Sequence, residues 1–447
     1  MAVSALVITF NCARNLIDSA VFASHIISLL SKSSTLPDLV VLCLQEVAPI
    51  AYAFLGGSYL RPYLDNAERA VDLAAAAYND TSYVKIASEN VGMTAILLFA
   101  RRDVARNVDE QSILTAGVGV GLWQMGNKGA AGISLDYKSS QGVQESVTFI
   151  SAHLAPMEWA CARRNQDWKS IAQGLVFERE KIESGEQRLE QTEITGLLSQ
   201  PHAPRTAFKN KPCGLYEVSK HVFVGGDLNY RTASSSPTTS DILLFPQPCE
   251  DESYPPHYWH LLSSDQLTAE LKAKRTCQGF KEAPIDFPPT YKYADAVRKR
   301  IENGEINAES MDEYKVGNKW DWATHRWPSW CDRILYHGYT SGLKDDLMPK
   351  FYTALPLMVT SDHRPVAFLV EIPGSRGAEA GAESRPEIPF KINRRWKEAR
   401  AAARAKEVIV GVLALLTTTW EALWTLAALV LLMILLTSGS VYWRSRT

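Results

Sequence analysis

The sequence lacks an excess of charge of either sign: its 447 residues carry 47 Lys and Arg against 49 Asp and Glu, a formal net charge of −2. Proteins that bind nucleic acid neutralise many phosphates with basic side chains and release counterions. This balance therefore argues against a nucleic-acid partner, although it leaves room for a basic pocket that holds a small polyanion. Apolar residues make up 46% of the chain, which is enough for a packed globular core.

The sequence also lacks a regular cysteine pattern. Its seven cysteines are odd in number and irregularly spaced, without the paired spacing of a zinc site or the framework of a small disulfide-bonded protein. A reducing, cytosol-facing body is expected. A secretory signal is missing as well, because the N-terminus has no basic segment and its first apolar run, at residues 6–10, stops at Asn11.

No long apolar run occurs before residue 408. Between 408 and 443 the only charged side chain is Glu421, and a basic stretch at 394–406 precedes this segment. A helix needs about 20 apolar residues to cross a bilayer, so we expect one transmembrane helix at 422–443, with a shallow hairpin through 417–421 as the alternative. Without a signal at the other end, this helix would be a tail anchor in the endoplasmic reticulum membrane, with the rest of the chain in the cytosol.

Short apolar runs rich in Val, Ile, Leu and Phe recur along the first 372 residues and are typical of buried strands. Stretches of helical character lie between some of them, at 19–30 and 159–180, so the pattern predicts a mixed α/β body. The predicted domains are a catalytic body at 1–373, a linker and basic juxtamembrane stretch at 374–407, and a membrane-anchor region at 408–443. The predicted strands are residues 6–10, 39–44, 94–99, 147–150, 221–224, 334–336 and 365–372.

Polar side chains with catalytic potential stand at the ends of these runs. If the later strands are antiparallel to the earlier ones, these side chains gather at one rim of the sheets, where loops on a rigid scaffold commonly carry catalytic groups. Asn11, Glu46, His153, Asp227 and Asn229 each come after a run, whereas Asp332, Asp362 and His363 come just before one.

Carboxylates and amides, without a cysteine cluster or a histidine triad, are the ligands of a hard cation such as Mg²⁺. We expect one Mg²⁺ held mainly by Glu46 with Asn11 nearby, where it would neutralise phosphate charge. Asp227 would orient or deprotonate an attacking water. His363 would donate a hydrogen bond to a phosphoryl oxygen, and Asp332 would fix the tautomer of that histidine.

Each of these residues has a simpler explanation when it is taken alone. A carboxylate at a strand end, such as Glu46, is more often solvated or a cap than a metal ligand, and single histidines such as His153 and His363 are more often core residues. Asp362 is compatible with a turn residue that bonds its own backbone, and GNKG at 126–129 is compatible with a hairpin turn. The catalytic interpretation therefore depends on finding these residues together in one set of motifs.

Four sequence blocks supply that set. GGDLNYR (225–231), PPTYKY (288–293), PSWCDRIL (328–335) and SDHRPV (361–366) resemble, in the same order, the signature blocks of inositol polyphosphate 5-phosphatases. With their weaker companions they span about residues 5–372, and their joint occurrence makes coincidence a poor explanation. The chain is similar to the fungal tail-anchored type of that family. The companions are TFN at 9–11, LQE at 44–46, GNKG at 126–129, SAHL at 151–154, RRNQD at 163–167 and GFKE at 279–282.

The resemblance implies a fold and a set of residue roles. The fold is a four-layer α/β sandwich of the DNase I type, with two central mixed β-sheets flanked by helices. By this resemblance, Glu46 would bind Mg²⁺, and Asp227 and Asn229 would act at the water and the scissile phosphate. Asp362 would be one of the catalytic groups. His153 and His363 contact phosphate, with Asp332 behind His363. The implied substrate-binding residues are Lys292 and Tyr291 for the neighbouring 4-phosphate, Asn127 and Lys128 near the 1-phosphate, and Arg231.

The expected function is Mg²⁺-dependent hydrolysis of the 5-phosphate of phosphatidylinositol 4,5-bisphosphate to phosphatidylinositol 4-phosphate, because the expected tail places the body beside lipid. Soluble inositol polyphosphates are the second substrate class. A nuclease on the same scaffold would share many of the rim residues, but it is disfavoured by the charge balance and by the PPTYKY and PSWCDRIL blocks. An inactive membrane adaptor is disfavoured because every rim residue that the mechanism requires is present.

Overall fold

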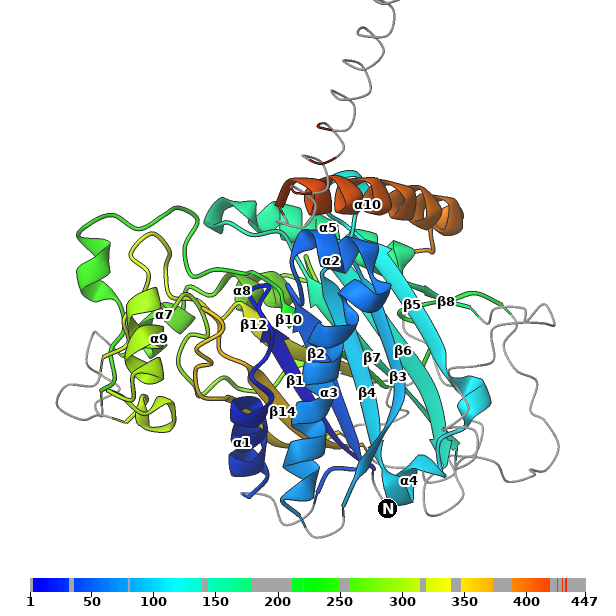
Figure 1. Ribbon diagram of the computed structural model, residues 1–447, viewed down its shortest axis with the longest axis horizontal. Helices are drawn as coiled ribbons and strands as arrows, with labels where there is room; N and C mark the ends of the chain where they lie inside the picture. Colours follow the sequence, from blue (N-terminus) through cyan, green and yellow to red (C-terminus); the bar gives the residue numbers. More distant parts are fainter. Residues whose placement is uncertain are drawn as a thin grey trace, which may run out of the picture.

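The structure is a computed structural model in which two β-sheets lie between layers of helices (Figure 1). The predicted architecture of two mixed β-sheets flanked by helices is confirmed. The described residues are 3–31, 36–78, 81–138, 144–178, 211–219, 221–249, 257–313, 319–338, 347–372 and 388–418, with single positions at 424, 428 and 431.

The first sheet has two parallel strands, β1 and β2, at its centre, and its other neighbouring strands are antiparallel. Every residue of β2, with the sequence LVVLCLQ, is buried. A strand that is covered on both faces is apolar along its whole length, because neither set of alternating side chains meets water. The strands in order across this sheet are β13 (Met348–Ala354), β14 (Val366–Ile372), β1 (Val3–Asn11), β2 (Leu39–Gln45), β4 (Thr94–Arg101) and β3 (Tyr83–Val91).

The second sheet repeats this plan, with the parallel pair β7 and β10 at its centre and antiparallel neighbours on both sides. A separate two-stranded ribbon is formed by β8 (Val176–Phe177) and β9 (Cys213–Gly214). The strands in order across the second sheet are β11 (Lys281–Glu282), β12 (Asp332–Gly338), β10 (His221–Asp227), β7 (Gln144–His153), β6 (Gly129–Lys138) and β5 (Leu114–Gly119).

The two glycines before Asp227 allow the sheets and strands to approach closely at the site end. A Cβ on Gly225 would meet the Sγ of Cys43, on the other sheet, at 3.1 Å. A Cβ on Gly226 would lie 2.0 Å from the carbonyl oxygen of Ala152 on the neighbouring strand, a distance that real Cβ atoms do not reach. Only glycine leaves this space, so the GGD sequence brings the end of β10 against both β2 and β7.

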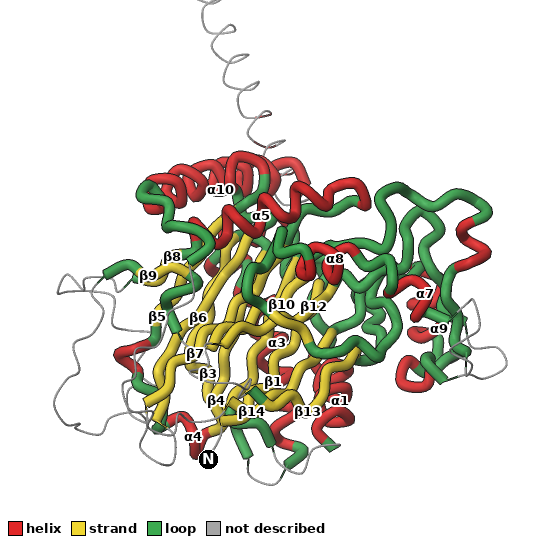
Figure 2. Tube along the Cα trace, turned by 180° about the vertical axis from the view of Figure 1, so that it is seen from behind, coloured by secondary structure: helices red, strands yellow, loops and turns green. Residues whose placement is uncertain are grey.

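Helices cover the outer face of each sheet, as Figures 1 and 2 show from opposite sides. Apolar side chains of α1 (Ser19–Leu30) and α3 (Arg61–Ala76) pack on the first sheet, and those of α5 (Cys161–Gly174) and α8 (Gln266–Lys272) pack on the second. The remaining α-helices are α2 (Ile50–Leu55), α4 (Arg102–Ala105), α7 (Trp259–Leu262), α9 (Asp295–Glu302) and α10 (Trp396–Thr418). The 3₁₀ helices are η1 (Gly57–Tyr59), η2 (Glu110–Ser112), η3 (Leu122–Gln124), η4 (Glu158–Ala160), η5 (Asp241–Leu244) and η6 (Ala308–Ser310).

The last described helix, α10, runs across the predicted boundary at 407/408 and lies against α2 and η3. In the part of the chain that the structure describes, no helix is both long enough and apolar enough to cross a membrane. The predicted span at 422–443 lies outside the described residues, apart from positions 424, 428 and 431. The domain limits and the anchor therefore stay predictions.

Candidate active site

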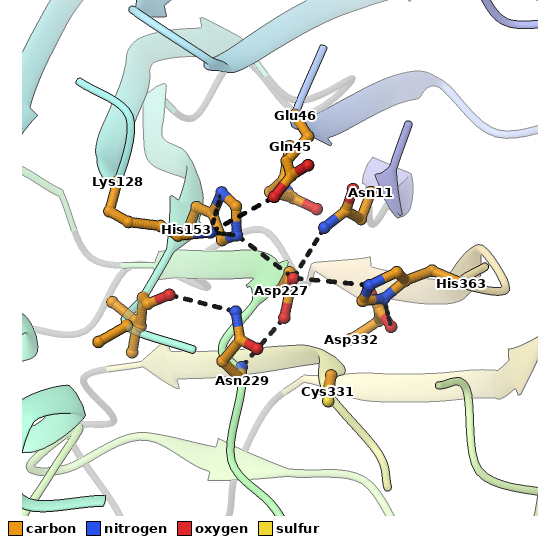
Figure 3. Close-up of polar contacts among 12 residues, drawn as sticks. Asn11, Gln45, Glu46, Lys128, His153, Asp227, Asn229, Cys331, Asp332 and His363 are labelled. Carbon is orange, nitrogen blue, oxygen red and sulfur yellow. Dashed lines mark hydrogen bonds and ion pairs between the residues drawn. The ribbon is translucent and has the colours of Figure 1, made fainter. Parts of the chain in front are cut away.

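The predicted rim forms at one end of the two sheets because parallel strands finish together and their antiparallel neighbours start there. Asn11 ends β1, and its register partner is Gln45 at the end of β2. On the second sheet, Asp227 at the end of β10 is the register partner of His153 on β7 and of Asp332, the first residue of β12. The strand order thus gathers side chains that are hundreds of residues apart in the sequence (Figure 3).

Asp227 is the centre of the rim's hydrogen-bond network (Figure 3). The Asn11 amide donates to Asp227 Oδ2 at 2.8 Å, and the Asn229 backbone N–H donates to Asp227 Oδ1 at 3.1 Å. The Nε2 atoms of His153 and His363 lie 3.3 and 3.9 Å from the same Oδ2 atom. One carboxylate therefore faces two imidazole rings and an amide, although it is only 2% exposed.

The charge of Asp227 is fixed by these neighbours. Burial by itself would raise the pKa of the carboxyl, but His363, His153 and Lys128 outweigh burial and hold the pKa well below its ordinary value. Asp227 is therefore a carboxylate at neutral pH, able to accept a hydrogen bond from a water molecule.

The neighbours of His363 favour its positively charged form, whereas those of Asp227 favour the negatively charged form. Its Nδ1 lies 2.9 Å from Asp332 Oδ2, and the Thr290 hydroxyl donates to that oxygen at 2.7 Å. Burial alone would lower the pKa of His363, but Asp332 and Asp227 raise it to about 9. The ring is consequently an imidazolium at neutral pH, with Nδ1–H directed at Asp332 and Nε2–H available toward the centre of the rim.

Cationic and aromatic side chains from the predicted substrate-binding set lie beside His363. The Tyr291 and His363 rings have centroids 4.4 Å apart, and the Arg231 guanidinium stands 4.5 Å from the Tyr291 centroid. Lys292 forms an ion pair with Asp362 and lies 5.3 Å from the same aromatic centroid. Burial would raise the pKa of Asp362, but His363 and Lys292 outweigh it and lower the pKa, so this carboxyl is ionised.

Glu46 stands opposite this group, just after β2, in a left-handed backbone conformation with φ of 44°. Such a conformation is uncommon for glutamate and persists where the surroundings enforce it, often at functional sites. Arg14 Nε lies 3.4 Å and Lys128 Nζ 3.6 Å from its carboxylate oxygens. Burial would raise the pKa of Glu46, but His153, Lys128 and Arg14 outweigh it and lower the pKa.

The predicted loop residues Asn127 and Lys128 reach the rim from the turn that precedes β6, the strand next to β7. Lys128 Nζ contacts the fully buried ring of His153, and burial lowers the pKa of both groups. Asn127 Oδ1 is buried and has no hydrogen-bond partner among the described residues. Buried polar atoms are usually paired, so this oxygen is a candidate contact for a bound ligand or water.

Asn229 turns its side chain back into the protein. Its φ is 59°, its Nδ2 donates to the Leu154 carbonyl oxygen at 3.1 Å, and its Oδ1 accepts from Arg231. The structure thus holds Asn229 against Asp227 through the backbone rather than through its amide.

Two sets of side chains offer donor atoms that could hold a metal ion. Ligand atoms of Asp227, Asp332 and His363 lie within 4.8 Å of one another, but a protonated His363 cannot ligate a cation, and its Nδ1 is already paired with Asp332. Glu46 and Asn11 offer hard oxygen donors on the other side of Asp227 and fit Mg²⁺ better (Figure 3). The Glu46 side chain is also 25% exposed, so an ion could reach it.

Three residues that sequence reasoning did not single out complete the site. Gln45, buried behind Glu46, accepts from the Thr9 hydroxyl at 3.2 Å and donates to the Ser151 hydroxyl at 3.1 Å, which joins both sheets. The Ser361 hydroxyl donates to the Asn11 carbonyl oxygen at 2.6 Å and accepts from the His363 backbone N–H at 3.1 Å. Thr290 is the third. All lie inside or beside the motif blocks, which is the signal that could have found them.

The sequence is similar to those of known proteins over most of its length. The model of the Endonuclease/Exonuclease/phosphatase family 2 matches residues 8–369. The chain belongs to this family. Polyphosphatidylinositol phosphatase INP53 of Saccharomyces cerevisiae is 29% identical over 332 residues, which cover 74% of this chain and 23% of INP53. The type II inositol 1,4,5-trisphosphate 5-phosphatase of Mus musculus is 26% identical over 345 residues, which cover 77% of this chain and 27% of the relative.

A solved structure supports the fold of this family member. The inositol polyphosphate 5-phosphatase domain of SPsynaptojanin, in complex with inositol (1,4)-bisphosphate and calcium ion, has a TM-score of 0.56 and 23% identity. The match covers 91% of this chain and 90% of that one. The relatives include inositol polyphosphate 5-phosphatases, which are phosphoric monoester hydrolases, so the expected similarity to that group is confirmed. The tail-anchored type and the individual residue roles stay predictions.

Proposed function

We propose that this chain removes the 5-phosphate of phosphatidylinositol 4,5-bisphosphate at a membrane surface in a Mg²⁺-dependent reaction, leaving phosphatidylinositol 4-phosphate. The observation that carries the proposal is the pairing of an ionised Asp227 with a protonated His363 across a 3.9 Å gap. Groups whose pKa values are driven in opposite directions are suited to acting on water and on phosphate in the same reaction.

The side chains support a direct attack of water on phosphorus. Asp227 would hold the water, His363 would donate to a phosphoryl oxygen, and Asp332 with Thr290 would keep the imidazolium protonated and fix the orientation of its ring. The water oxygen bonds to phosphorus as the phosphorus–oxygen bond to the inositol ring breaks. The proton released by the water passes through Asp227, and the ring oxygen gains a proton and becomes a hydroxyl.

Mg²⁺ would be held by Glu46 with Asn11. When bound, it supplies positive charge that neutralises phosphate oxygens. Lys128 and Arg14 already lie near the Glu46 carboxylate and would remain beside a bound phosphate as further cations.

Lys292 supports a substrate with a second phosphate next to the scissile one. Its ammonium pairs with Asp362 beside His363, so it can bind an anion close to the reacting centre. Arg231 adds a guanidinium that is 2% exposed and fixed over Tyr291. The name of the Mus musculus relative gives inositol 1,4,5-trisphosphate as its substrate, so soluble inositol polyphosphates are the second candidate class for this chain.

Exposed apolar side chains near the rim favour the lipid over the soluble substrate. Leu122 and Trp123, in the turn that leads to Lys128, are 64% and 63% exposed. On α10, which contacts η3, Ile409 and Leu413 are 60% and 57% exposed. Apolar surface of this kind beside a phosphate-binding rim suits an enzyme that works at a bilayer.

The tail extends the same proposal. Residues 408–443 carry one charge, so a tail anchor at 422–443 would hold the catalytic body on the cytosolic face of the endoplasmic reticulum membrane. A protein that stays in the pellet through high salt and carbonate would support the anchor, and release by carbonate would contradict it.

Phosphate release from purified inositides, with and without Mg²⁺, tests the proposed activity. We expect release from short-chain phosphatidylinositol 4,5-bisphosphate, less from inositol 1,4,5-trisphosphate, and little from phosphatidylinositol 4-phosphate. Abasic duplex DNA is the control for a nuclease. Cleavage of that DNA without phosphate release from any inositide would overturn the proposal, and faster turnover of the soluble compound would make it the preferred substrate.

A further inference from the structure

The C-terminal helix α10 is built onto the catalytic body through one of its faces. Arg400, Arg404, Glu407 and Gly411 follow one another at spacings of four, three and four residues, so their side chains share one side of the helix. Glu407 is 0% exposed. A carboxylate with no access to water needs charged or hydrogen-bonding partners, because its desolvation otherwise costs far more than packing returns.

Arg404 and Gly411 fix α10 on the end of α2. The Arg404 guanidinium donates to the carbonyl oxygens of Phe54 and Leu55, the latter at 3.1 Å. Those carbonyls belong to the last turn of α2, which has no partners for them inside the helix. A Cβ on Gly411 would meet Leu55 and Phe54 at 3.1 Å, so glycine lets the two helices come close together.

With α10 in this position, the Glu407 side chain contacts Gly126, in the loop that leads to Lys128 at the rim. Its Oε1 accepts the backbone N–H of Gly126 at 2.9 Å and also accepts from Arg400 at 2.7 Å, while Arg404 lies 3.4 Å from Oε2. Glu407 and Gly126 are 281 residues apart in the sequence. The carboxylate is thus neutralised by two arginines and still has one hydrogen bond for the loop.

Gly126 is held on both sides. Its N–H is bound by Glu407, and its carbonyl oxygen accepts from the Met93 backbone N–H at 2.8 Å. There is no space for a side chain, since a Cβ would lie 2.7 Å from the Val91 carbonyl carbon. Two residues further on, Lys128 contacts both Glu46 and His153. The position of Gly126 therefore sets where Asn127 and Lys128 enter the rim.

We propose that Glu407 is a positioning residue for the loop at 121–128, so that α10 acts as a part of the substrate-binding site and not only as a connection to the tail. Glu407 touches neither phosphate nor metal and works through the Gly126 N–H. The inference rests on the proposed function, because the loop carries Asn127 and Lys128, which that function assigns to substrate binding.

Steady-state kinetics on the full-length chain test the proposal, with short-chain phosphatidylinositol 4,5-bisphosphate as substrate. Glu407→Ala removes the acceptor, and we expect KM to rise roughly 10- to 100-fold with a smaller change in kcat, since a lost charge-assisted hydrogen bond is worth about that factor. Glu407→Gln keeps an acceptor oxygen and should recover part of the loss. Glu398→Ala is the matched control, because Glu398 is an exposed glutamate on the same helix, and it should behave like the parent chain.

Lys128→Ala provides the test that separates positioning from general stability. If Glu407 acts through the loop that carries Lys128, the double variant should have nearly the KM of Lys128→Ala alone, because the group that Glu407 positions is gone. Losses that multiply would show that the two residues act independently and would overturn the proposal. Equal kinetics of Glu407→Ala and Glu398→Ala would overturn it too.

Amide hydrogen exchange gives a readout that does not need turnover. We expect exchange in a peptide covering 121–128 to accelerate in Glu407→Ala and to stay unchanged in Glu398→Ala. In Glu407→Gln the exchange rate should lie between those of the parent chain and Glu407→Ala. Unchanged protection in Glu407→Ala would contradict the contact itself. A parent chain that releases no phosphate from inositides would contradict the proposed function, whereas the exchange result would still decide whether Glu407 holds the loop.

Discussion

The substitution Asp332→Asn tests the electrostatic reasoning most directly, because it removes one negative charge and keeps the size of the side chain. Asp332 Oδ2 lies 2.9 Å from His363 Nδ1, and both groups are buried. Burial alone would lower the pKa of His363, but Asp332 and then Asp227 raise it from 6.5 to about 9. Without the Asp332 charge, we expect the pKa of His363 to fall to about its ordinary value of 6.5 or below.

This change should appear in the alkaline limb of the pH profile of kcat/KM. In the parent chain His363 is protonated up to pH about 9, so activity that needs its proton should persist through neutral pH. In Asp332→Asn the limb should move down by about 2.5 pH units or more, and activity at pH 8 should drop roughly 10- to 50-fold relative to the parent. The profile should be measured from pH 5.5 to 9.5 with short-chain phosphatidylinositol 4,5-bisphosphate.

Thr290→Val is the matched control for this experiment. It removes the neutral hydrogen bond of 2.7 Å to the same Asp332 oxygen but leaves the charge in place. Its alkaline limb should therefore stay close to that of the parent. If Asp332→Asn leaves the limb where it was, or if Thr290→Val moves it equally far, His363 is not the group that Asp332 keeps protonated, and the argument fails.

The pKa of His363 also determines how the free energy of unfolding changes with pH. The pKa of His363 is raised in the folded chain, to about 9 from 6.5. Its contribution to the free energy of unfolding is therefore fully present below pH 6.5 and is lost as pH rises through about 9. Thermal unfolding of the parent should weaken over this window more than that of Asp332→Asn. Equal slopes for the two chains would contradict the assigned pKa.

The other predictions concern the groups around His363. Asp227→Ala should lower kcat about 10²-fold or more while the circular dichroism spectrum stays that of a folded chain. Near-normal turnover would contradict the proposal that Asp227 holds the attacking water. Glu46→Gln should shift the Mg²⁺ titration of activity to higher concentration, because it removes the ligand charge; an unmoved titration would place the metal elsewhere. Lys292→Ala should reduce activity on 4-phosphorylated inositides more than on those without a 4-phosphate, and equal losses would assign Lys292 to structure.

The mixed α/β composition and most strand positions could be predicted because they depend on local patterns, whereas the sandwich of two sheets is implied by the resemblance to the family. The first six residues of the fully buried strand β2, LVVLCL, are an uninterrupted apolar run, and they are the predicted segment 39–44. Helix α1 spans the predicted segment 19–30 and begins at an Asp18 N-cap. The second predicted helix is shorter than expected, since α5 ends at Gly174 instead of continuing to 180. Helix ends depend on capping and on packing, which apolar composition does not reveal.

The rim could also be predicted, but its internal geometry could not. That Asn11, His153, Asp227 and His363 converge follows from strand ends and motif blocks, and the structure brings them together. That Asn229 turns its amide toward Leu154 depends on a backbone φ of 59° that no pattern encodes. The bracing of the rim by Gln45 could not be foreseen either, because it joins strands of two different sheets.

The C-terminal region shows how basic side chains beside the predicted boundary at 407/408 are used in the fold. The residues around 400 are basic, as in a stretch that binds anionic lipid. Arg400, however, pairs with Glu407, and Arg404 donates to carbonyl oxygens at the end of α2. The opposite side of the same helix is apolar and exposed at Ile409 and Leu413. A helix with one face fixed to the body and the other free for lipid would transmit an orientation from the bilayer to the rim. If the following residues anchor as proposed, lengthening the tail beyond Thr418 should alter activity less than releasing α10 from α2, because the loop at 121–128 is held by Glu407 on α10.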